Sequence, residues 1–486
     1  MIQVSEGSEY DIKCWKIGNK YHLKSLLAYG AYGTIAIGYS KNSNEELAIK
    51  KYYDVYSDIQ ESIHIIRELV ILRHLNHPYI IKPIDLIQPF FGSRDLYMVM
   101  EYFSMDLEYL IQQKISLSNM QIKKIMYCLL SAIGYLHSTG IFHRDIKPSN
   151  VLINNEFEIK LCDFDSSRFI QNLITKRPHL VDRIKEDKNP GSSESPNRCI
   201  NKNIGLNELH FHKTSMPSFK NKEHEEANSE IEDESPKIFI QKSPTLIMNL
   251  KYKENVNELY FFNKNDLASY LFKNRENRKK IQRKLSKHVT TRWYRSPEII
   301  LCENEYDYKV DVWSAGCIFA ELLNNKKENK SSYIQDFKLF KGGFCPPLSP
   351  TLPEKNSNLQ KDQMATIIDI LGYQDDQSLS FISDEKQIYE LKKYPRNSKK
   401  EWKEIFPCIT KDEASLLSKM IEFNPYFRAT AQECLQHPYF SDAIECIPFT
   451  PAEGDINLNM DKYKTIDRKL VKKIIWDEVE YYKVKN

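Results

Sequence analysis

The sequence predicts an α+β fold of two lobes, a small β-rich lobe followed by a larger, mainly helical one. Short runs rich in Ile, Val, Tyr and Leu alternate with turns over residues 21–102, which is typical of an antiparallel sheet. From Asp106 onward, apolar residues recur at helical spacing instead. A polar stretch rich in Asn, Lys, Glu and Ser, residues 169–285, interrupts the second lobe.

Each element is expected from its local pattern. In the first lobe, β-rich composition predicts strands over 21–27, 34–39, 46–52 and 96–100. Apolar residues at near-helical spacing predict one helix over 59–75. In the second lobe, the clearest helical patterns span 119–137, 310–323 and 412–421.

The polar interruption divides the chain into segments. We expect an N-terminal extension (1–20), the first lobe (21–102), the second lobe in two parts (103–168 and 286–440), an insertion between them (169–285) and a C-terminal extension (441–486). Low hydrophobicity with many charges predicts disorder over much of the insertion. The helical composition of 265–285 predicts a helix docked at its end, and the apolar runs 238–240 and 260–262 could dock as well.

The bulk composition excludes several classes of function. A hydrophobic fraction of 41% allows sizeable cores, while a net charge of +3 over 486 residues gives no case for a nucleic-acid or membrane binder. The ten cysteines form no Cys-x-x-Cys pair, which favours a reducing compartment. No apolar run approaches the roughly 18 residues that span a bilayer. We therefore expect a cytoplasmic or nuclear protein with no nucleic-acid or membrane partner.

The most informative segment is His-Arg-Asp-Ile-Lys-Pro-Ser-Asn at 143–150, followed by Cys-Asp-Phe at 162–164. Phosphoryl transfer from ATP needs a base, a cation and metal ligands in fixed positions, because most of its catalysis is positioning and charge neutralisation. Asp145 would accept or orient the proton of a substrate hydroxyl, and Lys147 would neutralise the travelling phosphoryl group. Asn150 and Asp163 would hold Mg²⁺ against the phosphates.

This segment resembles the catalytic motifs of eukaryotic protein kinases, and the resemblance extends upstream. It implies a bilobal protein-kinase-like fold that binds ATP and Mg²⁺. Lys50, in Leu-Ala-Ile-Lys, would contact the phosphates and pair with Glu68 on the first helix. The residues expected to line the nucleotide site are Ala28, Tyr29, Gly30, Gly33, Ala48, Lys50, Met100, Glu101 and Ser149. Ala28 stands where the kinase template has its first glycine, so a slightly stiffer loop is expected.

Two later segments resemble the mitogen-activated protein (MAP) kinases. These are Val-Thr-Thr-Arg-Trp-Tyr-Arg-Ser-Pro-Glu at 289–298 and Asp-Val-Trp-Ser-Ala-Gly at 311–316. The segment near 337–361 is similar to the family's extra segment in the second lobe, and residues 457–482 are similar to its tail, which runs back over the first lobe. Together with the unusual activation segment, the resemblance is nearest to the atypical MAP kinases of apicomplexan-type parasites.

The resemblance implies partners and supporting residues. The substrates would be proteins with Ser-Pro or Thr-Pro sites, and an upstream kinase and docking peptides would be further partners of a monomer. Thr291 would help to position Asp145 and Lys147. Glu298 would pair with Arg428 to brace the second lobe.

The first departure from the family is Asp165, where kinases have glycine after Asp-Phe. Glycine tolerates backbone conformations that cost another residue on the order of 1 kcal/mol, although Asp accepts them better than most. We expect the fold to survive and the rate to be reduced. The alternative is a pseudokinase that binds ATP and acts as a signalling scaffold.

The second departure is the activation lip, where the family's Thr-x-Tyr falls on Ser286-Lys287-His288. Phosphate on Ser286 would order the lip through charge-assisted pairs with Arg67, Arg144 and Arg168. The alternative is that these are ordinary surface arginines.

Weaker hypotheses concern the remaining charged residues. His288 could charge near Arg292 and Arg295, which we assign to regulation, although a neutral structural histidine is the simpler interpretation. The insertion's Ser-Pro pairs at 195, 235 and 243 are candidate autophosphorylation sites. Basic and apolar residues at 279–285 fit either a docking peptide or a charged helix face, and Asp442 and Glu445 are the nearest match to an acidic docking groove.

Overall fold

A computed structural model of the chain describes residues 12, 14–30, 33–169, 264–279, 291–303, 306–348, 361–442, 446–452 and 467–485. Several of the sequence hypotheses lie outside these residues. They are the lip at Ser286–His288, the Ser-Pro pairs, the apolar runs 238–240 and 260–262, the basic residues after Lys279, and Glu445.

The first lobe is a five-stranded antiparallel sheet with the order β1-β2-β3-β5-β4, joined by one long helix. Its elements are β1 (Tyr21–Gly30), β2 (Gly33–Ser40), β3 (Glu46–Tyr52), α2 (Ile59–His74), β4 (Pro83–Ile87) and β5 (Leu96–Glu101). Asp58 begins α2, since its side chain accepts hydrogen bonds from the amides of Gln60 and Glu61. The four expected strands and the helix are confirmed, and β4 is an addition.

The second lobe is mainly helical, with small sheets beside its first helices. Its first part contains β6 (Met105–Asp106), α3 (Leu107–Gln112), α4 (Asn119–Ser138), β7 (Ile141–Phe142), η1 (Pro148–Asn150), β8 (Val151–Ile153), β9 (Ile159–Leu161) and β10 (Arg168–Phe169). Its second part contains η4 (Arg292–Tyr294), α8 (Pro297–Ile300), α9 (Lys309–Asn324), η5 (Lys327–Ser332), α10 (Gln363–Leu371), α11 (Glu385–Leu391), α12 (Trp402–Ile405), α13 (Lys411–Met420), α14 (Ala431–Leu435) and η6 (Pro438–Phe440).

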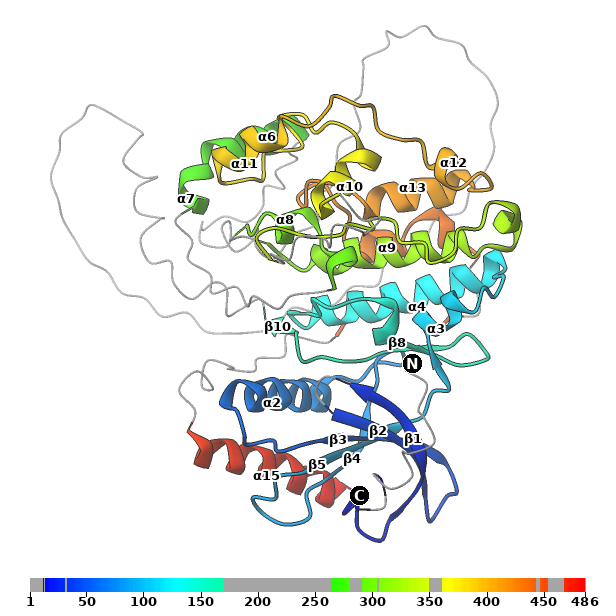
Figure 1. Ribbon diagram of the computed structural model, residues 1–486, viewed down its shortest axis with the longest axis vertical. Coiled ribbons are helices and arrows are strands. Elements are labelled where there is room, and N and C mark those ends of the chain that lie inside the picture. The colour runs from blue at the N-terminus through cyan, green and yellow to red at the C-terminus, as the bar shows by residue number, and fades with distance from the viewer. Residues whose placement is uncertain are drawn as a thin grey trace, which may run out of the picture. The chain divides into compact units, whose positions relative to one another are not determined.

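Helices α4 and α9 pack against each other in the centre of this lobe (Figure 1). Every residue of α9 is buried, as expected of a helix surrounded by other elements. Helix α4 begins with a capping box, in which the Ser118 side chain accepts from the amide of Gln121 and the Gln121 side chain accepts from the amide of Ser118. These two helices supply the rigid base from which the loop after β7 projects.

The C-terminal helix α15 (Arg468–Lys485) lies alongside α2 and also contacts β4 (Figure 1). Its buried apolar residues, Val471, Ile475, Val479 and Tyr482, recur at helical spacing and form one stripe. Arg73 of α2 forms an ion pair of 2.9 Å with Glu478. The expectation that the tail returns to the first lobe is confirmed for this helix.

The end of the insertion is docked on the second lobe. Helix α6 (Lys264–Lys273) buries Leu267, Ala268 and Leu271, and α7 (Arg275–Lys279) follows it. The buried Arg278 donates to the carbonyl oxygens of Ser380, at 2.9 Å, and Phe381. The expected docked helix is therefore confirmed up to Lys279. Over the described residues, no helix is long and apolar enough to cross a membrane.

Candidate active site

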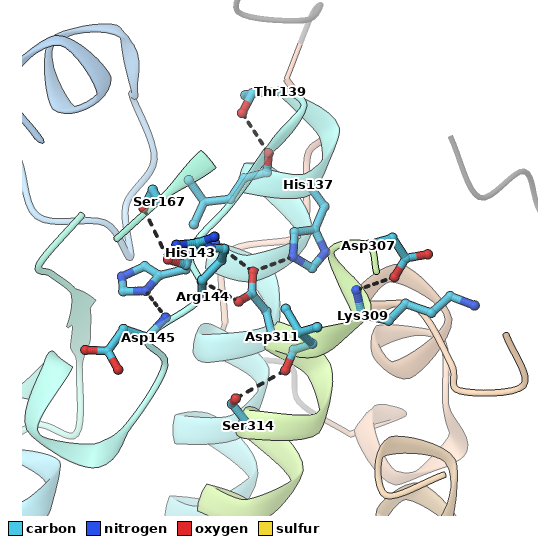
Figure 2. A network of polar contacts seen from close by, with 12 residues as sticks. His137, Thr139, His143, Arg144, Asp145, Ser167, Asp307, Lys309, Asp311 and Ser314 are labelled. Carbon is cyan, nitrogen blue, oxygen red and sulfur yellow. Dashed lines mark hydrogen bonds and ion pairs between the residues drawn. The ribbon is translucent and has the colours of Figure 1, made fainter. Parts of the chain in front are cut away.

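The loop of residues 143–150 is anchored by a side chain from α9. The carboxylate of Asp311 accepts hydrogen bonds from the amides of His143 and Arg144, both at 2.8 Å, and lies 3.0 Å from Nε2 of His137 on α4. Figure 2 shows Asp311 between these groups. Asp311 is 1% exposed, so water does not compete for these bonds. Two helices thus fix the start of the loop, where Arg144 adopts a φ of 70°.

Asp145 accepts hydrogen bonds from three groups of this site. Its carboxylate accepts from Lys147 Nζ at 2.7 Å, from Asn150 Nδ2 at 3.2 Å and from the backbone amide of Thr291 at 3.2 Å. Burial alone would lower the pKa of Lys147, but Asp145 and, beyond it, Asp163 raise it, so this lysine is charged at neutral pH. The structure therefore brings together the expected base, cation and supporting threonine. The threonine makes its contact through the main chain.

Lys50 of β3 and Glu68 of α2 form a two-bond ion pair. Lys50 Nζ lies 2.9 Å from Oε1 and 3.0 Å from Oε2 of Glu68. Burial opposes the charge on Lys50, but Glu68, Tyr52 and Asp163 together act in the other direction, so the pKa of Lys50 is raised. The pair predicted from the sequence is present, with α2 placed so that its carboxylate faces β3.

The residues expected to line the nucleotide site lie on the strands around Lys50. Ala48 of β3 pairs with Met100 of β5, and both are buried. Glu101, which follows Met100, forms an ion pair of 2.9 Å with Lys160. Ser149 lies in η1, directly before Asn150.

The glycine loop connects β1 to β2. Gly30 pairs with Gly33, and Ala28 and Tyr29 precede them on β1. A Cβ on Gly33 would lie 2.1 Å from the carbonyl oxygen of Lys51, so only glycine fits there. This close approach holds the end of the loop against β3, the strand that carries Lys50.

The Asp-Phe-Asp segment is packed inward. Phe164 is fully buried, with its ring 4.9 Å from that of His143, and His143 Nε2 lies 3.0 Å from the carbonyl oxygen of Cys162. The left-handed conformation falls on Asp163, with a φ of 69°, and Asp165 is not among the described residues of positive φ. The backbone freedom that glycine would give at residue 165 is therefore not used here, because the left-handed residue is Asp163, two residues earlier.

Asp165 differs from glycine chiefly by its charge. Its side chain is buried, and its pKa is raised to about 7 by this burial, by Asp163 and by Glu68. The segment therefore adds two carboxylates, Asp163 and Asp165, to that of Glu68 on α2 near Lys50.

The three arginines expected to bind a lip phosphate converge. Arg67, Arg144 and Arg168 donate to three successive carbonyl oxygens, those of Asp165 at 3.0 Å, Ser166 at 2.8 Å and Ser167 at 3.0 Å. Burial and the neighbouring Arg144 lower the pKa of Arg67 to about 10, and burial with the other two arginines lowers that of Arg168 to about 9. They therefore form a cluster of cations that repel one another.

Arg292 and Arg295 contact a different region. Arg292 donates to the carbonyl oxygen of Gly343, and the neighbouring Trp293 donates to that of Gly342 at 3.1 Å. Arg295 is buried and its side chain contacts Cys345. Both arginines therefore bind the segment that begins the second-lobe insert.

The brace predicted within the second lobe is present. The guanidinium of Arg428 donates to both oxygens of Glu298, at 2.7 and 3.0 Å, and both side chains are fully buried. This prediction is confirmed, and the pair holds α8 beside the segment that begins α14.

Two residues that the sequence analysis did not single out contribute to the site. Asp311 lay within a motif quoted only for family resemblance. Tyr52 lies two residues after Lys50 on β3. Side chains two residues apart on a strand share one face, so the sequence could have placed Tyr52 beside Lys50.

Comparison with known proteins agrees with this geometry. The protein kinase domain model matches residues 21–182 and 271–440. The chain belongs to the protein kinase family. The unmatched residues between these ranges lie within the insertion, so the match covers both lobes of the kinase.

Curated relatives place this kinase with the MAP kinases. It is 24% identical over 477 residues to mitogen-activated protein kinase 14 of Arabidopsis thaliana, covering 96% of this chain and 92% of that protein. It is 26% identical over 429 residues to a mitogen-activated protein kinase homolog, NTF3, of Nicotiana tabacum, covering 88% and 79%. With mitogen-activated protein kinase 15 of Xenopus laevis it shares 26% over 459 residues, covering 92% and 56%.

Proposed function

We propose that this MAP-kinase-like enzyme is a proline-directed serine/threonine kinase that transfers the γ-phosphoryl group of ATP to protein substrates. The observation that carries the proposal is the position of Asp145, whose carboxylate is held by Lys147, Asn150 and the amide of Thr291. A carboxylate fixed from three sides beside a charged lysine is suited to orienting a hydroxyl for in-line transfer.

Each side chain has a distinct task in this proposal. Asp145 accepts or orients the proton of the substrate hydroxyl, and Lys147 supplies positive charge beside it. Lys50, kept charged and oriented by Glu68, contacts the α- and β-phosphates. The loop at Gly30 and Gly33 covers the phosphates, and Met100 with Glu101 lines the adenine side, with Ala28, Tyr29, Ala48 and Ser149 around them.

The residues present fit magnesium. Asn150 uses its amide nitrogen on Asp145, which leaves the amide oxygen for a cation, and Asp163 adds a carboxylate. Among the described residues, no group of three or more His, Cys, Asp or Glu side chains could hold a metal ion. Mg²⁺ commonly binds through one or two protein ligands plus substrate phosphates, so this donor set suits it. When bound, it would neutralise charge on the phosphates.

Proline direction rests on the resemblance of residues 289–298 to the substrate-binding segment of MAP kinases. The described part of this segment, 291–298, is held by the bonds of Arg292 and Trp293 to the insert and by the Glu298–Arg428 pair. A Ser-Pro peptide should be phosphorylated, and the same peptide with alanine in place of the proline should not.

Regulation through the arginine cluster is part of the proposal. Arg67, Arg144 and Arg168 repel one another, and an anion would relieve that repulsion. Phosphate on Ser286, added by an upstream kinase or by the enzyme itself, would supply it. Ser286→Ala should therefore lower activity, and unchanged turnover would contradict this assignment. Docking-peptide partners, a monomeric state and a cytoplasmic or nuclear location complete the proposal.

The deciding experiment compares transfer of labelled phosphate to a Ser-Pro protein by wild type and by Asp145→Asn. Transfer should disappear in Asp145→Asn while the thermal shift caused by ATP and Mg²⁺ is retained. Asp376→Asn, an exposed aspartate paired with Lys392, is the matched control and should behave as wild type. Nucleotide binding without transfer in the wild type, also after phosphorylation of Ser286, would favour the pseudokinase scaffold.

A further inference from the structure

Tyr52 contacts both members of the Lys50–Glu68 pair. Its hydroxyl donates to Oε2 of Glu68 at 2.9 Å, and Lys50 Nζ lies 4.7 Å from the centre of its ring. The side chain is fully buried on β3, and Glu68 is 3% exposed. Oε2 of Glu68 is therefore shared between a lysine and a tyrosine, one donor on either side, in a place that water does not reach.

The Tyr52 hydroxyl has no second good hydrogen-bond acceptor among the described residues. Lys50 is a donor, so among the described residues the hydroxyl has one other acceptor besides Glu68, Met98 Sδ at 4.0 Å, and a thioether is a weak acceptor. If α2 moved away from β3, a buried hydroxyl would lose its good acceptor and Glu68 would lose a donor. An unsatisfied buried polar group is costly, so the hydroxyl favours the position of α2 in which Glu68 faces Lys50.

We propose that Tyr52 is a positioning residue for ATP, which acts through Glu68 to hold Lys50 toward the phosphates. The inference rests on the assignment of Lys50 and Glu68 to ATP binding in the proposed function. Tyr52 itself touches no reacting atom. The Tyr52 hydroxyl on β3 holds the Glu68 carboxylate on α2, and that carboxylate holds the Lys50 ammonium on β3.

The test is Tyr52→Phe, which removes the hydroxyl and keeps the ring over Lys50. The expected result is a fall of about tenfold in kcat/KM for ATP, equivalent to about 1.4 kcal/mol, with a raised KM for ATP and an unchanged KM for the Ser-Pro peptide. A merely structural role would reduce the amount of active enzyme, which lowers kcat and leaves the KM for ATP as it was.

Tyr21→Phe is the matched control. Tyr21 is also a buried tyrosine of this sheet whose hydroxyl donates to a buried carboxylate, Asp85, at 2.8 Å. It makes no contact with the Lys50–Glu68 pair among its hydrogen bonds in the described part of the chain. Tyr21→Phe should lower the melting temperature and leave the KM for ATP unchanged. Equal effects of the two variants on KM for ATP would overturn the inference.

A second background keeps the test decisive. If Tyr52→Phe alone is not recovered folded, the comparison is made with Asp165→Asn in place, where an unchanged kcat/KM for ATP overturns the inference.

Lys50→Met separates this inference from the proposed function. Loss of ATP-dependent transfer in Lys50→Met with wild-type kinetics in Tyr52→Phe refutes the role of Tyr52 alone. Retained transfer in Lys50→Met refutes the assignment of Lys50, and the role of Tyr52 with it.

Discussion

The guanidinium of Arg67 on α2 donates a hydrogen bond to the backbone carbonyl oxygen of Asp165, 3.0 Å away. The next residue on the helix, Glu68, bonds Lys50. Two adjacent side chains therefore tie α2 to the Asp-Phe-Asp segment and to the strand that carries the candidate phosphate-binding lysine. Movement of the helix would break both contacts together, so the position of α2 affects both the candidate site and the segment that precedes the lip.

Replacing Asp165 should raise the rate of transfer. Asp165 does not occupy a positive-φ conformation, so what it adds is a carboxylate that Asp163 and Glu68 repel. We expect Asp165→Gly and Asp165→Asn to increase kcat by a similar, few-fold factor, measured with a Ser-Pro peptide at saturating ATP. A gain with glycine only would point to the backbone, and no gain with either would show that the charge is tolerated without loss.

Breaking the Glu298–Arg428 pair should destabilise the protein severely. Removing one partner leaves the other charge buried and unpaired, which costs about 3–5 kcal/mol. Glu298→Gln should therefore lower the free energy of unfolding by an amount in this range, measured by denaturant titration. The exposed pair Lys393–Glu390 is the control, and Glu390→Gln should change stability by less than about 1 kcal/mol.

Asp311→Asn should loosen the loop that carries Asp145. The amide group offers one acceptor oxygen where the carboxylate offers two, and its NH₂ would face a backbone donor at His143 or Arg144. We expect a loss of about 2–3 kcal/mol in stability and a fall in kcat, with the KM for ATP little changed. Asp307→Asn, which alters a carboxylate near the start of the same helix, serves as the control. Similar kcat values for both variants would contradict the anchoring role.

Acidification should destabilise the protein through His64. Burial, together with Arg67, Arg168 and Arg144, lowers the pKa of His64 to about 4 from its ordinary value of 6.5. The unfolded chain then takes up the proton first, so the stability tied to neutral His64 is complete above about pH 6.5 and is lost as the pH falls toward 4.

Melting temperatures between pH 7 and pH 4.5 check this prediction. The curve of His64→Asn should be shallower than that of wild type, because other groups titrate equally in both proteins. His22→Asn, at an exposed position, should follow the wild-type curve. Parallel curves for wild type and His64→Asn would remove His64 as the cause.

Much of the fold could be predicted because apolar residues recur at regular helical spacing in its longest helices. Helix α4 was expected over 119–137 and spans Asn119–Ser138, and α9 was expected over 310–323 and spans Lys309–Asn324. Strand β4 was missed because it is five residues long, begins with a proline and carries a buried aspartate, Asp85. The hydroxyl of Tyr21 satisfies that aspartate from another strand, which no local pattern reveals.

The sequence by itself determined the residue types of the site. The motifs at 143–150 and 162–164, with Lys50 and Glu68, were enough to name a base, a cation, metal ligands and an ion pair, since they resemble the protein-kinase motifs residue by residue and carry the side chains that phosphoryl transfer needs. Tertiary structure alone decided how they are held: by Asp311 from α9, by the Tyr52 hydroxyl, and by a left-handed turn at Asp163 and not at Asp165. Hydrogen bonds between residues far apart in the chain depend on the packing of helices and strands, and that geometry has no local signature in the sequence.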